Sequence, residues 1–184
     1  MGSNFHNAFN DLVATLLQLY LYTFLLRIIL QAVGADFYNP ISQLIARVTT
    51  PLVRPLQAVL PRWPRFDPAA GIVMFLLTML YVWVMALLWN QRVGVDGVVL
   101  YAALKIVALV LNLYLFGLVI QAILSWLGPG MNNPAGNLLW VMNEPLLKPI
   151  RRVIPPQAGL DFSPLVLIFA LVFVRQLIPL PAFF

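Results

Sequence analysis

The chain has 184 residues, of which 62% are hydrophobic and only 9% are charged, and its formal net charge is +5. An average soluble domain is roughly 45 to 50% apolar and about 25% charged, so this composition indicates a protein in contact with lipid and gives no sign of nucleic-acid binding. The absence of cysteine excludes disulfides, zinc–thiolate sites and iron–sulfur clusters.

The first predicted span runs from about residue 8 to residue 33, and from Leu12 onward its only charge is Arg27. The preceding residues lack the basic region of a cleavable signal peptide, so we expect this span to be retained. An intramembrane arginine is a candidate functional residue. Arg27 either serves a substrate or ion, or pairs within the fold and anchors the span about two turns from the membrane surface.

The next segment, 39–61, opens with Asn39-Pro40 and reads as an amphipathic surface segment rather than a span. Its apolar residues recur at helical spacing on one face: Ile41, Ile45, Val48, Leu52, Pro55 and Val59. The opposite stripe holds Arg47, Thr50, Arg54 and Gln57. Because proline lacks a backbone donor and favours a break, we predict two short helices that lie in the membrane surface and meet at a bend near Pro51.

A second span is predicted over 69–89, where 21 consecutive residues carry no charge, close to the length that a helix needs to cross a bilayer core. Asp67-Pro68 precedes it as a helix cap followed by proline at the first helical position. Asp67 and its later counterpart Asp161 are alternatively ligands for a cation or a protein partner. The connection 90–97 contains Arg92 as its only basic residue.

The third predicted span, about 98–127, carries Asn112, Gln121 and Ser125 as its deep polar side chains, for which hydrogen bonding between helices is the default role. Lys105 in this span and Arg175 in the fourth, about 164–178, are expected to extend toward the membrane surface. Ser163-Pro164 is predicted to start the fourth span as a cap and a first helical proline.

The second linker begins at Asn133-Pro134 and contains Pro145 and Pro149, with a break predicted near Pro145. Its apolar residues are Leu138, Leu139, Met142, Leu146, Ile150 and Val153, and its charged residues are Glu144, Lys148, Arg151 and Arg152. Glu144 and Lys148 are spaced for a salt bridge along a helix. The three basic residues alternatively form a pocket for anionic lipid headgroups, together with Arg47 and Arg54 of the first linker.

Residues 20–67 match residues 114–161 at a constant shift of 94, with 14 of 48 positions identical. Such periodicity indicates a duplicated unit. We therefore predict an all-α membrane protein with two parallel repeats, residues 1–97 and 98–184, each a hairpin of two spans joined by a proline-kinked amphipathic linker. Seven Lys or Arg residues lie in the loops 35–68 and 128–163 against one in 90–97, which predicts cytoplasmic linkers and both termini outside.

The second linker resembles the repeat motif of the YggT family, also called YlmG-like. The resemblance rests on Ser125-Trp126, Asn133-Pro134, the run from Glu144-Pro145 to Pro155, and Gly159 to Pro164. The first copy matches at Arg27, Asn39-Pro40, Pro51, Pro55 and Asp67, but has Thr50 at the glutamate position, whereas the second has Gln121 at the arginine position. The resemblance implies a small bacterial inner-membrane protein linked to osmotic-shock tolerance and potassium uptake, with plastid and Gram-positive relatives linked to division, nucleoid organisation or cytochrome assembly.

Two functions follow as hypotheses. The first is a non-enzymatic membrane scaffold or stress-tolerance factor whose linkers bind anionic lipid and a protein partner or further copies of the chain. The second is an oligomeric pathway for potassium or another small solute, although the sequence has no carbonyl-filter motif and no mid-membrane carboxylate. The only histidine, His6, has no accompanying nucleophile or base, so we expect no enzymatic activity, cofactor or metal site.

Overall fold

The computed structural model describes residues 2–61, 63–126, 134–155 and 161–181. Within these ranges the chain forms six helices and no strand: α1 (Gly2–Ala32), α2 (Pro40–Gln57), α3 (Pro68–Leu88), α4 (Val95–Trp126), α5 (Pro134–Val153) and α6 (Ser163–Gln176). The predicted all-α class is confirmed for this part of the chain.

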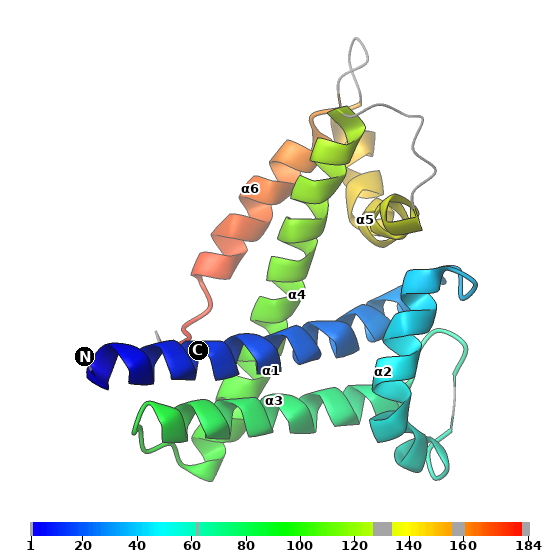
Figure 1. The fold of residues 1–184 in the computed structure, drawn as a ribbon. Coiled ribbons are helices and arrows are strands. Elements are labelled where there is room, and N and C mark those ends of the chain that lie inside the picture. Colours follow the sequence, from blue (N-terminus) through cyan, green and yellow to red (C-terminus); the bar gives the residue numbers. More distant parts are fainter. Residues whose placement is uncertain (1, 62, 127–133, 156–160, 182–184) are drawn as a thin grey trace.

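The helices form two similar groups of three (Figure 1). In the first, α1 and α3 lie side by side and α2 packs across one of their ends, and in the second α4 and α6 take the places of α1 and α3 while α5 takes that of α2. The groups meet where α3 and α4 contact each other, and α4 runs steeply across α3 in Figure 1. The two linker helices, α2 and α5, contact each other and lie away from the N-terminus and the α3–α4 connection (Figure 1).

Three apolar clusters hold the linker helices in place. The largest joins the spans of the first group to α2 and α4 and includes the fully buried Phe24, Val53 and Met74. A second cluster, around Ile45 and Leu138, brings α2 and α5 together. In the second group, Leu118, Leu147 and Leu167 join α4, α5 and α6. Each linker helix is therefore buried on one side against the other helices of its group.

Two of the long helices end in the same kind of reverse turn. After α1, the amide of Ala35 bonds to the carbonyl of Leu30 at 2.9 Å, and Gly34 takes the left-handed conformation with φ of 70°. Asn90 takes this role after α3 with φ of 51°, and the following amide bonds to Ala86 at 2.8 Å. Both patterns are Schellman caps, for which glycine and asparagine are the suited residues.

Among the described residues, three helices are long and apolar enough to cross a membrane, within Phe5–Ala32, Pro68–Leu88 and Val95–Leu124. The predicted fourth span corresponds to α6, whose 14 helical residues extend about 21 Å, less than the roughly 30 Å of a bilayer core. Large apolar side chains nevertheless remain exposed on all four helices, for example Leu19, Trp83, Phe116 and Phe169. Such continuous apolar exposure is unfavourable in water and expected for surfaces that face lipid.

The predicted break at the linker prolines is wrong. Pro51 and Pro55 both lie inside α2, and Pro145 and Pro149 both lie inside α5, so each linker contains one helix rather than two. A proline removes only its own hydrogen bond to the residue four before it. The prolines in each helix are four residues apart, so the two missing backbone hydrogen bonds lie on the same side of the helix. Apolar contacts on the other side keep the helix continuous.

The predicted starts of α3 and α6 have different outcomes. Asp67 caps α3 and Pro68 is its first residue, as predicted. In α6, however, Ser163 is the first helical residue and not the cap. The Ser163 amide bonds to the Asp161 carboxylate at 2.9 Å. The Asp161 carboxylate, two residues earlier, therefore accepts the hydrogen bond from the helix start that was predicted for the serine side chain. Asp161 occupies the position equivalent to Asp67.

Candidate functional site

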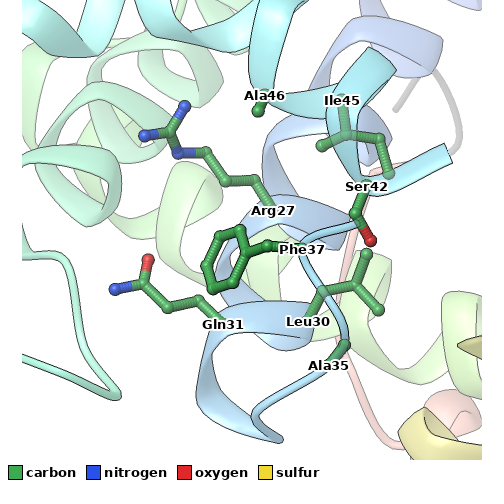
Figure 2. Close-up of a pocket in the computed structure, with 8 residues that line it drawn as sticks. All are labelled: Arg27, Leu30, Gln31, Ala35, Phe37, Ser42, Ile45 and Ala46. Carbon is green, nitrogen blue, oxygen red and sulfur yellow. The ribbon is translucent and has the colours of Figure 1, made fainter. Parts of the chain in front are cut away.

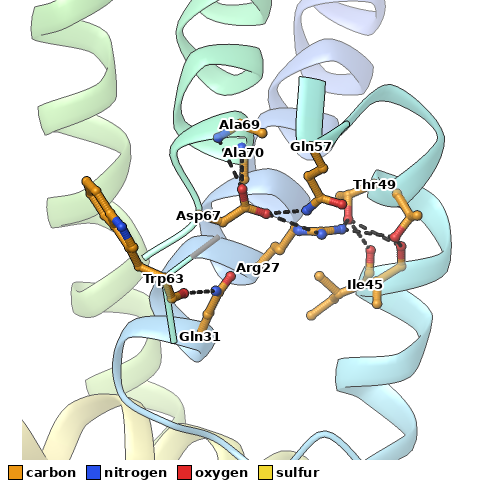
Figure 3. Close-up of polar contacts among 11 residues, drawn as sticks. Arg27, Gln31, Ile45, Thr49, Gln57, Trp63, Asp67, Ala69 and Ala70 are labelled. Carbon is orange, nitrogen blue, oxygen red and sulfur yellow. Dashed lines mark hydrogen bonds and ion pairs between the residues drawn. The ribbon is translucent and has the colours of Figure 1, made fainter. Parts of the chain in front are cut away.

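A polar cluster lies where α1, α2 and the start of α3 meet, and its centre is Arg27 (Figure 3). The guanidinium donates to the hydroxyl oxygens of Thr49 and Thr50 at 2.8 and 3.1 Å. It also approaches the Asp67 carboxylate at 3.6 Å between Nη2 and Oδ2. The structure thus assigns Arg27 a partner within the fold, one of the two readings left open by the sequence.

The other members of the cluster are oriented by local backbone contacts. Each threonine hydroxyl donates to a carbonyl four residues earlier, Thr49 to Ile45 at 2.7 Å and Thr50 to Ala46 at 2.5 Å, which leaves its lone pairs toward Arg27. The buried carboxylate of Asp67 accepts from the amide of Ala69 at 3.1 Å through one oxygen and from the Gln57 side chain through the other.

A second cluster lies in the corresponding place between α4, α5 and the start of α6. Arg151 donates from Nη1 to Glu144 at 2.6 Å and from Nε to Asp161 at 2.8 Å. Beside them, the amide of Asn143 donates to the Gln121 side chain at 2.7 Å. Glu144 therefore pairs with Arg151, seven residues away, rather than with Lys148 as the helical spacing predicted.

The two clusters use equivalent positions of the repeat, because every member is related to its counterpart by the shift of 94. The pairs are Arg27 and Gln121, Thr49 and Asn143, Thr50 and Glu144, Gln57 and Arg151, and Asp67 and Asp161. Arginine and glutamine have exchanged places between the copies. The first cluster receives its arginine from the span, and the second receives it from the linker helix.

The model of the CCB3/YggT family matches this chain twice, over residues 6–88 and 100–182. The chain belongs to the CCB3/YggT family. The two segments are again displaced by 94 residues, so the tandem repeat predicted from the sequence is confirmed and extends over nearly all of both helix groups.

Several bacterial proteins are similar to this chain over most of its length. An uncharacterised protein of Pseudomonas aeruginosa is 37% identical over 91% of this chain and 86% of its own length. The uncharacterised protein YggT of Escherichia coli K12 is 35% identical over 90% of this chain and 86% of its own length. A Vibrio alginolyticus protein encoded in the region 3′ of proC is 36% identical over 93% of both chains. No solved structure matches the chain.

In the second CCB3/YggT repeat, the ion pairs affect the ionisation of both partners. Burial on its own would raise the pKa of the Asp161 carboxyl, but hydrogen bonds from Ser163 and Arg151 outweigh it, so this pKa lies below its ordinary value. For Arg151, burial alone would lower the pKa, whereas the two carboxylates raise it above its ordinary value. The pair is therefore ionised at neutral pH.

A small pocket adjoins the first cluster, between the end of α1 and the start of α2 (Figure 2). Its volume is about 70 Å³, and its wall includes the Arg27 side chain, Phe37 and Ser42. This volume holds only a few water molecules. The pocket is too small for an organic substrate, so the cluster is better suited to fastening α2 to the spans than to binding a small molecule.

The remaining candidate residues occupy distinct places. Arg47, Arg54, Lys148 and Arg152 are exposed on the linker helices, whereas Arg151 is partly buried in the second cluster. Asn39 caps α2 by accepting from the Ile41 amide at 2.9 Å, and its side-chain amide donates to the carbonyl of Pro134, the first residue of α5, at 2.8 Å. Asn112 lies with Gln18 on a crevice between α1, α4 and α6. Asn133 and the Ser125 side chain lie outside the described residues.

The expectation that Lys105 extends toward the membrane surface is wrong. Its side chain is 5% exposed, donates to Gln18 of α1 at 3.1 Å, and lies 4.8 Å from the ring centre of Tyr81 in α3. An amide oxygen and an aromatic face inside the fold together compensate the charge. Sequence reasoning also missed the roles of Thr49, Gln57 and Asn143 in the clusters, because the repeat shift relates these positions to one another but does not show what they contact.

Proposed function

We propose that this protein is a non-enzymatic, multi-pass protein of the bacterial inner membrane that holds two amphipathic helices against the cytoplasmic surface, where they bind anionic lipid. In this proposal α1, α3, α4 and α6 are the four spans and form two parallel hairpins. The physiological setting that the family resemblance implies is tolerance of osmotic stress.

The observation that carries the proposal is the surface of α2 and α5. On α2, Arg47 and Arg54 are exposed beside a separate exposed apolar stripe of Leu44, Val48 and Leu52, while a third side packs on the spans. On α5, Lys148 and Arg152 are exposed and Trp140 is 53% exposed. A helix with exposed apolar and basic sides suits the boundary between acyl chains and phosphates.

The contact between the two linker helices strengthens this reading. The bond from Asn39 to the Pro134 carbonyl and the apolar contact of Ile45 with the cluster around Leu138 place both basic surfaces at one end of the molecule. Basic residues near an anionic membrane each contribute on the order of 1 kcal/mol, weakened by salt. Four exposed cations on these two neighbouring helices therefore favour anionic over zwitterionic lipid.

Native mass spectrometry of the purified protein tests the proposal. Replacing Arg47, Arg54, Lys148 and Arg152 with glutamine should reduce bound phosphatidylglycerol or cardiolipin, by up to about fivefold for each charge. Arg151 is kept, because its guanidinium holds two carboxylates. The matched control replaces only the three arginines with lysine, which preserves charge and should preserve lipid binding. Unchanged lipid binding in the folded glutamine variant would contradict the proposal.

A solute pathway is the alternative, and the crevice between α1, α4 and α6 is the feature that favours it. Its volume is about 820 Å³, and the amides of Gln18 and Asn112 interrupt an otherwise apolar lining. Potassium flux into liposomes that contain only the purified protein separates the two functions. The scaffold proposal expects no flux above that of empty liposomes.

A further inference from the structure

The contact between the two repeats joins unlike surfaces. One surface belongs to α3 and includes the Tyr81 ring, and the other belongs to α4 and includes Lys105, whose ammonium group lies over that ring. Both side chains are buried at 2% and 5% exposure. Because the chain is a tandem repeat with a shift of 94, each surface has a counterpart: α6 carries the equivalent of the α3 surface, and α1 carries the equivalent of the α4 surface.

Neither of these two counterpart surfaces is covered by the other within the described part of the chain. Both α1 and α6 pack against α4, but they do not pack against each other. A crevice of about 820 Å³ separates them. The interface that joins the repeats is therefore used once within the chain, and one copy of each of its two surfaces is left over.

Side-chain exposure shows the same asymmetry on α1. Ala102, Lys105 and Leu109 of α4 are buried, whereas their equivalents on α1 are all exposed: Ala8, Asp11 and Thr15. The apolar residues between them follow this pattern, since Leu12, Leu16 and Leu19 are 56%, 58% and 63% exposed while the equivalent Ile106, Val110 and Leu113 are partly buried.

The α6 surface shows the corresponding difference. Thr78 and Val82 of α3 are buried, whereas their equivalents Val172 and Gln176 are exposed. Along both helices, side chains equivalent to buried residues of α3 and α4 are exposed on α6 and α1. Both leftover surfaces are therefore suited to the same kind of helix–helix contact that α3 and α4 make.

Charge makes the leftover surfaces complementary. Shifting the Tyr81–Lys105 contact by 94 residues places Arg175 of α6 against Asp11 of α1. Neither side chain has an ion-pair partner in the described part of the chain.

We propose that a second copy of this chain covers these surfaces, with α1 of each copy packed on α6 of the other and Asp11 of each paired with Arg175 of the other. The pairing occurs twice about a twofold axis, so it closes after two chains and four repeats. The contact continues the interface that already joins the repeats, and it goes beyond the proposed lipid-binding function.

Disulfide cross-linking in native membranes tests this arrangement directly, because the chain has no cysteine of its own. Asp11→Cys and Arg175→Cys are placed in separate copies that carry different tags and are expressed together. The expected result is an oxidised dimer that carries both tags. The matched control combines Asp11→Cys with Trp83→Cys, on an exposed face of α3, and should give no such dimer.

Two outcomes overturn the proposal. The first is the absence of a mixed dimer, and the second is an oxidised monomer as the only product when both cysteines are in one chain, which would show that α6 closes on α1 of the same copy.

Charge reversal gives an independent readout. Asp11→Arg and Arg175→Asp should each lower the dimer fraction, by about tenfold, and the double variant should restore it; equal dimer fractions in all three would contradict the pairing.

Discussion

Arg27 reaches Asp67 from a span, whereas Arg151 reaches Asp161 from a linker helix. In each repeat the position that lacks the arginine holds a glutamine, which still donates or accepts a hydrogen bond in the cluster. A carboxylate removed from water requires a partner, and the arginine can come from either side of the contact, at 3.6 Å from Asp67 in the first repeat and at 2.8 Å from Asp161 in the second. Both clusters therefore contain an arginine–aspartate pair, but the helix that supplies the arginine differs between the repeats.

This exchange predicts that the arginine of the first repeat can be moved to the linker helix. Arg27→Gln alone leaves the buried Asp67 without a cation and should lower the free energy of unfolding by about 3 to 5 kcal/mol. Adding Gln57→Arg reproduces the residue arrangement of the second repeat and should recover at least half of that loss. Thermal unfolding in detergent, followed by circular dichroism, measures both effects.

The control for this cycle is Gln57→Arg alone, which places two arginines beside one carboxylate and should be less stable than the wild type. The coupling between positions 27 and 57 is then the difference between the double variant and the sum of the single variants. A coupling near zero would show that the two positions act separately and that the resemblance between the clusters has no energetic basis.

Sequence alone identified the charged residues of these clusters better than the uncharged ones. Arg27, Glu144 and Asp67 stand out because charges are rare in this chain. Thr50 and Gln57, in contrast, were assigned to the polar stripe that faces the headgroups. Helical spacing shows which residues share a side of α2, but not which side packs on the spans, so their contact with Arg27 and Asp67 required the structure.

At the scale of elements, the positions of all six helices follow from apolar runs and turn residues, while the continuity of α2 and α5 does not. The sequence rules treat each proline as a break. In α2, the buried Ile45, Thr49 and Val53 pack on one side both before and after Pro51, and these contacts hold the helix together. The predicted end of the fourth span, about residue 178, lies two residues beyond the end of α6 at Gln176, because apolar residues continue past the helix.

The start of α3 allows capping and ion pairing to be separated, since Asp67 contributes to both. Asp67→Asn keeps an oxygen that can accept from the amides of Ala69 and Ala70 but removes the negative charge. Asp67→Ala removes the cap as well and should cost about 1 kcal/mol more than Asp67→Asn. Chemical or thermal unfolding of the two purified variants measures the difference. Equal stabilities would show that the carboxylate serves Arg27 alone.

At the scale of the whole molecule, the repeat predicted that both linkers lie at the same end, and the contact from Asn39 to Pro134 agrees with that arrangement. The relation between the repeats was not predictable. It depends on which face of α3 meets α4, and apolar residues surround both helices almost evenly. The buried Lys105 shows the difficulty, because its partners come from α1 and α3, and only the packed fold brings them together.

The last prediction concerns the orientation of the whole molecule in the membrane. The end that holds α2 and α5 exposes Arg47, Arg54, Lys148 and Arg152, whereas the α3–α4 connection has Arg92 alone. Basic residues in short loops are retained on the cytoplasmic side, so the linker helices should face the cytoplasm. Single cysteines at positions 54 and 92 of this cysteine-free chain report the two sides. In intact cells an impermeant maleimide should label Arg92→Cys and leave Arg54→Cys unlabelled until the membrane is permeabilised. Both variants must label after permeabilisation, which controls for accessibility. The reverse pattern in intact cells would place the linker helices outside, where they could not bind the anionic lipid of the cytoplasmic leaflet.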